Sequence, residues 1–245
     1  MASENNLTAV FTDIANAIRD KKGSVNTIKP INMADEILTI ETKSPIYSAL
    51  EAKGTDWSRA FYVDTSYITV FYYITELSES DLPPSSNVVN MNFMFWNCLN
   101  LTSVSQLDTS SCTSLYGMCY NCQKLTSIPQ LDTSSATNMG YMFYQCIELE
   151  KIDITKLTSN NSNFAYRCWS LKTLIIRTMD IIPDLNSNAF NNCYHFYGTT
   201  DATYNPNGLK DGRIYVPDDK VESLKTTTNW SVFADIIKPL SEYVE

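Results

Sequence analysis

The stretch Asn138-Met-Gly-Tyr-Met-Phe-Tyr-Gln-Cys-Ile-Glu-Leu149, preceded by Leu131-Asp-Thr-Ser134, is one copy of a sequence repeat. The cysteine of this copy belongs to a series at intervals of 24, 24, 22 and 25 residues: Cys98, Cys122, Cys146, Cys168 and Cys193. Around the first four cysteines the same types return, with Met or Phe four residues before, Leu three after, and Val, Ile or Leu six after. A period that holds in several columns predicts a solenoid, in which stacked turns bury a shared core.

Each copy is predicted to hold one short helix and one strand. Met91, Met94, Phe95 and Cys98 lie at i, i+3, i+4 and i+7, the spacing of one helical face. Ser, Thr and Asn precede each such segment and are suited to N-capping. The segment after the cysteine, such as residues 125–131, is short and ends in turn residues, which favours an extended strand. The expected fold class is therefore α/β, with a helix and a strand in each repeat of about 24 residues.

The repeat resembles the BspA-like leucine-rich repeats of bacterial surface proteins and phage proteins. Three copies match closely, from Asn90 to about Thr158, and an upstream remnant at 85–90 suggests an earlier start. The copies around Cys168 and Cys193 are degenerate, because Ala165 and Ala189 stand where large residues are expected. The resemblance implies repeats over residues 90–200. The tail from Ile214 to Lys238 resembles the usual ending of such arrays, and residues 201–245 are expected to form a C-terminal cap of a strand and helices.

The N-terminal part divides into two further segments. Residues 1–43 are predicted to form two short helices, at 7–19 and 33–40, that serve in attachment or oligomerisation. The string from Phe11 to Ile37 resembles the N-terminal segment of tail and fibre proteins of phages that infect Firmicutes. Residues 44–89, rich in β-branched and aromatic residues, are expected to be a β-rich junction or the N-terminal cap of the solenoid.

Charge and hydropathy exclude several classes of partner. The formal net charge is −9 and the pI is near 4.6, and Lys and Arg are scattered singly. Without a basic face, nucleic acid and anionic membranes are not expected partners. No signal peptide is visible, and no apolar run approaches the roughly 20 residues of a membrane span, so no membrane insertion is expected.

The polar and thiol residues favour structural roles over chemistry. Cys119-x-x-Cys122 has metal-ligand spacing, but with His195 as the only histidine, packing of the thiols in the interior is favoured. Asp108 and Asp132 stand in register and would suit an acid pair or a calcium rung, although carboxylates that form turns are favoured. No nucleophile, base and orienting group form a recognisable set. We expect no enzyme activity, no catalytic residue, no metal and no cofactor.

One aromatic column is the candidate ligand-binding site. Two residues before each of the first four cysteines stand Trp96, Tyr120, Tyr144 and Tyr166. On the predicted helix this position lies about 200° from the inward cysteine and should face solvent. Exposed aromatic side chains suit sugar rings and protein hot spots. The alternative is that the rings stack on one another from turn to turn, and the sequence leaves both interpretations open.

Together these features predict a non-enzymatic binding module. The preferred hypothesis is a phage or prophage virion protein, a tail or fibre component assembled in the host cytoplasm. Its solenoid would recognise a glycan or protein of the host cell surface. Residues 1–43 would bind other virion proteins or further copies of the chain in a homo-oligomer. The alternative is a BspA-like adhesin on the bacterial cell surface.

Overall fold

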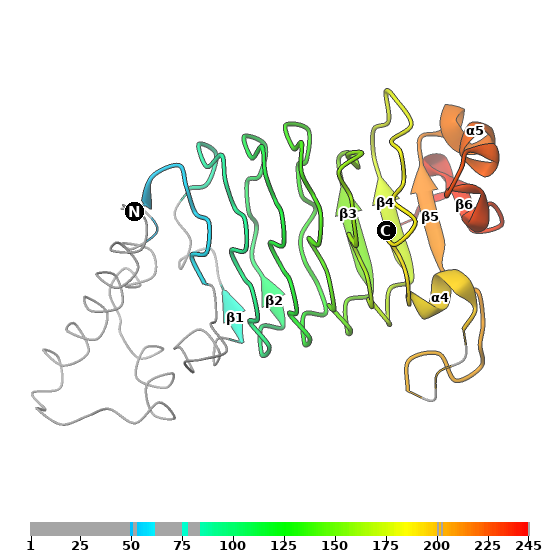
Figure 1. The fold of residues 1–245 in the computed structure, drawn as a ribbon, viewed down its shortest axis with the longest axis horizontal. Helices are drawn as coiled ribbons and strands as arrows, with labels where there is room; N and C mark the ends of the chain where they lie inside the picture. The colour runs from blue at the N-terminus through cyan, green and yellow to red at the C-terminus, as the bar shows by residue number, and fades with distance from the viewer. Residues whose placement is uncertain are drawn as a thin grey trace, which may run out of the picture.

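The structure is a computed structural model that describes residues 50, 53–61, 75–77, 84–199, 201 and 203–244. These residues form a parallel β-solenoid whose turns lie side by side (Figure 1). The strands pair in the orders β1-β2 and β3-β4-β5-β6, always in parallel. Their bounds are β1 (Glu76–Leu77), β2 (Ser103–Val104), β3 (Lys151–Ile154), β4 (Thr173–Ile176), β5 (Arg213–Val216) and β6 (Ile237–Pro239). The helices predicted within residues 1–43 lie outside the described residues.

The apolar column six residues after the cysteine forms one wall of the core. Its members are buried and stand in register on neighbouring strands, as in Leu77 beside Val104 and Ile152 beside Leu174. The column continues through the last two strands, where Ile214 pairs with Ile237. A parallel sheet with one inward residue per turn buries a continuous apolar stripe, which is why the repeat spacing predicts a solenoid.

The short helix predicted in each repeat is not formed, and tight turns take its place. In residues 91–98, alternate N–H groups donate to carbonyls of the next turn: those of Met91, Phe93, Phe95 and Asn97. The N–H groups between them donate to the carbonyl three residues back: those of Met94, Trp96 and Cys98. An α-helix instead needs bonds to the fourth residue back along its whole length. Positive φ angles of 56° at Phe93 and 60° at Asn97 interrupt any right-handed helix.

The inward positions of the predicted helix are nevertheless buried. Met91, Met94, Phe95 and Cys98 are at most 2% exposed, as are their counterparts in the next two repeats. In each of the two degenerate repeats, a small residue at one inward position is accompanied by a phenylalanine at the adjacent position, so that the core volume is kept. Phe164 precedes Ala165, whereas Phe190 follows Ala189, and all four are buried. A core tolerates such changes when the total volume is kept.

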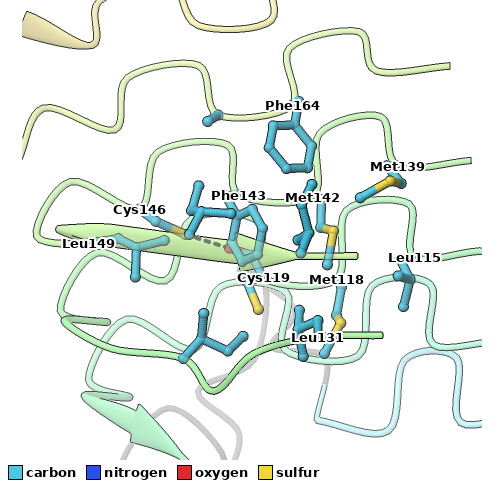
Figure 2. Packing of buried hydrophobic residues seen from close by; sticks show 14 of the residues in the cluster. Leu115, Met118, Cys119, Leu131, Met139, Met142, Phe143, Cys146, Leu149 and Phe164 are labelled. Atoms are coloured by element: carbon cyan, nitrogen blue, oxygen red, sulfur yellow. Dashed lines mark hydrogen bonds between the residues drawn. The ribbon is translucent and has the colours of Figure 1, made fainter. Parts of the chain in front are cut away.

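The cysteines form a ladder of buried thiols inside the solenoid. In Figure 2 the thiol of Cys146 donates to the Cys119 carbonyl of the preceding turn, at 3.0 Å. The other four cysteines of the series bond in the same way to the preceding turn, at 3.0–3.2 Å. All seven cysteines are buried and free. The cysteine therefore recurs because a small thiol both fills the core and satisfies a backbone carbonyl.

We expect the thiols to be inert in the native protein and fully reactive once it unfolds. Burial raises the pKa of all seven, that of Cys112 to about 12, so very little reactive thiolate exists at pH 8. Titration with a chromogenic disulfide reagent should find about seven groups in denaturant and a far slower reaction without it. Fast labelling of the native chain, or disulfides in fresh protein, would contradict this.

The C-terminal residues cover the last turn and then cross the sheet. Short helices η2 (Asp218–Lys220), α5 (Val221–Thr226) and η3 (Ser231–Phe233) follow β5, and η4 (Leu240–Glu242) follows β6. Near the end, the Lys151 ammonium lies 3.3 Å from the Tyr243 hydroxyl, and the Tyr243 ring contacts that of Tyr215. The chain end therefore lies against the outer face of the sheet, as its position over β4 in Figure 1 shows. Ile175, which alternates with the inward residues of β4, is also fully buried.

The described part of residues 44–89 contributes a turn of its own. Asp56 bridges to Asn90, and the N–H groups of Trp57 and Phe61 donate to the next turn just as those of the repeats do. The solenoid thus begins before residue 90, in agreement with the remnant at 85–90. Among the described residues, no helix is long and apolar enough to cross a bilayer.

Candidate binding face

The four aromatic residues singled out by the repeat form one continuous stack. The ring centroids of Trp96 and Tyr120 are 3.7 Å apart, those of Tyr120 and Tyr144 4.5 Å, and those of Tyr144 and Tyr166 5.0 Å. The three interplanar angles are 6–9°, so the rings are nearly parallel. Parallel strand turns about 4.8 Å apart bring equivalent side chains to stacking distance.

These rings are half-buried: part of each remains accessible to solvent, and part is covered by the neighbouring rings. The expected solvent-facing position was derived for a helix, and the tight turns orient the side chains differently. The stacking alternative is thus part of the observed structure. Because the ring planes follow one another along the solenoid, the edges of the rings and the tyrosine hydroxyls point sideways from the stack.

Three further aromatic side chains, which do not form an unbroken column in the repeat, extend the stack. Phe93 contacts Trp96 edge-on at 5.1 Å, and Tyr141 contacts Tyr144 at 5.6 Å. Tyr116 links the two, at 5.2 Å from Phe93 and 5.5 Å from Tyr141. We call the seven residues together the aromatic face: Phe93, Trp96, Tyr116, Tyr120, Tyr141, Tyr144 and Tyr166.

Glycines make room for the added rings. A Cβ atom at Gly117 would lie 2.8 Å from the Phe93 ring, and one at Gly140 would lie 3.2 Å from the Tyr116 ring. The sequence places Tyr116 and Tyr141 one position apart in the repeat, which is why no column contains both. The signal that could have found them is a glycine at the equivalent position of the following turn.

Amides border the stack on one side. The Asn121 amide donates to the Asn97 carbonyl oxygen of the preceding turn at 2.9 Å, and the Gln123 amide donates to Asn121. Asn97, Asn121 and Gln145 all have φ near +60°, a conformation that asparagine adopts more readily than most residues. The aromatic face thus has a fixed row of amides beside it.

The charge at the aromatic face differs from that of the whole chain. The six residues before each of the five cysteines contain no Asp, Glu or Lys, in a chain with 27 acidic residues. Two guanidinium groups lie close to rings of the aromatic face. Arg59 lies 5.7 Å from the centroid of Phe93, and Arg167 lies 5.5 Å from that of Tyr166. Burial raises the pKa of Tyr116 and Tyr120 further above that of an ordinary tyrosine, which is itself neutral at pH 7.

The other polar residues that the sequence singles out have structural partners. Asp108 and Asp132 each accept the backbone N–H two residues ahead, at 3.0 and 2.9 Å, and so stabilise turns. His195 is buried, with its Nδ1 2.6 Å from an Asp211 carboxylate oxygen. Across the described ranges, no three His, Cys, Asp or Glu side chains are grouped to hold a metal ion.

Comparison with known proteins supports the repeat and leaves the function open. Residues 65–174 match the model of a family described as Mycoplasma protein of unknown function, DUF285. The matched residues include the three copies that follow the repeat pattern most closely. Together with the solenoid, the match is compatible with a BspA-like repeat protein. No significant match was found among curated proteins or among solved structures.

Proposed function

We propose that the chain is a non-enzymatic binding module that uses the aromatic face to bind a molecule on a cell surface. The observation that carries this proposal is the stack of four parallel rings, extended by three more, along one side of the solenoid. All seven side chains are half-buried, so together they form a contiguous aromatic patch, and such patches commonly mark interaction sites.

The stack is suited to binding because its side chains are already fixed. Each inner ring is held between two neighbours, so few rotamers remain to be lost when a partner binds. Tyrosine also combines a large apolar ring with a hydroxyl that donates and accepts hydrogen bonds, and such residues dominate many binding surfaces. Pre-organised tyrosine rings therefore favour both contact area and directional bonds.

The biological setting we propose is a phage or prophage virion, as a tail or fibre component. Residues 1–43 would join the chain to other virion proteins, and their resemblance to Firmicutes phage proteins supports this. A BspA-like adhesin on the bacterial surface is the second candidate, favoured by the repeat alone. Gold-labelled antibodies against the chain would distinguish the settings, by labelling either purified particles or intact cells of the source bacterium.

Removing two hydroxyls of the stack should weaken binding and leave the fold intact. In the double variant Tyr120→Phe with Tyr144→Phe, ring stacking is retained while two hydrogen-bonding groups are lost. With each bond contributing about 0.5–1.5 kcal/mol, adsorption should weaken by about tenfold. The measurement is adsorption of fluorescently labelled full chain to a panel of Firmicutes and mycoplasma cells, beside a thermal melt.

The matched control is Tyr215→Phe, because Tyr215 is also half-buried and in contact with another ring, Tyr243, but belongs to β5. It should leave both adsorption and melting unchanged. Adsorption by the double variant equal to that of the unaltered chain would reject the aromatic face as the binding surface.

A further inference from the structure

We infer that the partner of the aromatic face is a protein surface rich in carbonyl and carboxylate oxygens, and not a polysaccharide. This inference rests on the proposed function and specifies the class of molecule that is bound. It follows from three features: which parts of the rings remain free, which charges stand beside them, and which polar groups surround them.

The ring faces are already occupied within the protein. Four rings have eight faces, and the three stacked contacts use six of them. At one end of the stack, the Arg167 guanidinium lies 5.5 Å from the centroid of Tyr166. Sugar rings are commonly held by C–H groups that lie on the electron-rich face of an aromatic ring. The aromatic face offers few such faces.

What the stack presents instead is electropositive. The edge of an aromatic ring carries the positive end of its quadrupole and attracts oxygen atoms. The hydroxyls of Tyr120 and Tyr144, and the amide row that includes Asn121, add hydrogen-bond donors beside these edges. Carbonyl and carboxylate oxygens, which a protein surface displays at high density, are the matching acceptors.

The distribution of charge supports the same partner. The six residues before each of the five cysteines lack Asp, Glu and Lys, although the chain as a whole carries a net charge of −9. Arg59 and Arg167 stand against rings near opposite ends of the aromatic face. An acidic partner would be repelled by most of the molecule and attracted here, which would orient its approach.

The composition of the surface also fits a protein partner. Tyr, Asn and Ser make up most of the outward positions in residues 116–121, 140–145 and 162–167. The same residues are enriched in antibody surfaces that bind proteins, where rigid rings supply area and small polar residues supply adaptable hydrogen bonds.

A substitution that adds one carboxylate tests the charge component. Gln145 is half-buried and lies next to Tyr144, so Gln145→Glu changes charge with almost no change in volume. If the partner is acidic, adsorption of the labelled full chain to the cell panel should fall about tenfold. This decrease should be smaller at high salt, because salt screens the added repulsion. Gln130→Glu is the control, because Gln130 is exposed and lies outside the aromatic face. It should have little effect.

Pretreatment of the cells identifies the class of molecule. Protease digestion of the cell surface should abolish adsorption, whereas mild periodate oxidation of sugars should leave most of it. Adsorption that survives protease and is lost after periodate would overturn the inference while leaving the proposed function intact. Gln145→Glu without effect would overturn it too. Failure to adsorb to any untreated cell would count against the proposed function itself.

Discussion

Replacing Phe143 by alanine is expected to destabilise the solenoid by about 3–5 kcal/mol, the usual range for a fully buried phenylalanine. The Phe143 side chain is 0% exposed and contacts the Phe164 ring edge-on at 5.5 Å. Its position in the neighbouring turns is held by Cys119 and Ala165, both small (Figure 2 labels the first). Truncation would therefore leave three small side chains in successive turns, and no larger neighbour in that column could fill the space.

Chemical denaturation of the full chain would measure the effect as a lower unfolding midpoint. Phe143→Leu is the matched control, since it keeps most of the volume and should cost clearly less. Glu148→Ala, an exposed change in the same turn, should stay within about 0.5 kcal/mol of the unaltered chain. A loss below about 1 kcal/mol for Phe143→Ala would show that the turns relax to close the cavity.

The stacking of turns could be predicted from sequence because it depends on residues that recur at a fixed period. Cys146, Met142 and Ile152 return in register in other copies, and each is buried where the pattern places it. Burial of such positions follows from hydrophobicity and spacing alone. The burial of the inward columns was therefore predicted correctly even where the backbone conformation was not.

The backbone of each repeat could not be predicted from the same spacing. Positions i, i+3, i+4 and i+7 are shared by a helix and by the overlapping tight turns seen here. The tight turns differ from a helix in two ways. Their φ is positive at Asn97 and its equivalents, and half of their N–H groups donate to the neighbouring turn of the solenoid. A bond between turns is a tertiary feature, so no local pattern contains it. Asparagine at the left-handed position is the one available signal.

The candidate site could be predicted in part for the same reason. Trp96, Tyr120 and their counterparts share a column, so the repeat period alone brings them together. They are half-buried, because tight turns in place of the expected helix stack the rings on one another. Phe93 and Tyr141 share the column five residues before the cysteine but were missed because Gly117 and Asn163 interrupt it, and Tyr116 stands one column away, in contact with both rings.

The C-terminal cap offers the second large effect, through Trp230. Its indole is 0% exposed, and its Nε1 donates to the Pro183 carbonyl at 2.9 Å, while the neighbouring Asn229 amide donates to the Leu185 carbonyl at 2.7 Å. These bonds join the segment after α5 to the loop that follows β4. Close by, Phe233 contacts the rings of Phe190, Phe196 and Tyr197 at 5.3–6.2 Å.

Trp230→Ala should therefore cost about 3–5 kcal/mol and loosen the cap before the repeats unfold. Because an uncapped solenoid exposes its core, the variant should bind a hydrophobic dye and aggregate at temperatures where the unaltered chain does not. Trp230→Phe keeps a ring but loses the hydrogen bond to Pro183. Its stability should lie between that of Trp230→Ala and that of the unaltered chain. Val232→Ala is the exposed control within η3. Unfolding of Trp230→Ala in one transition, with no dye binding beforehand, would show that the cap and the repeats form a single cooperative unit.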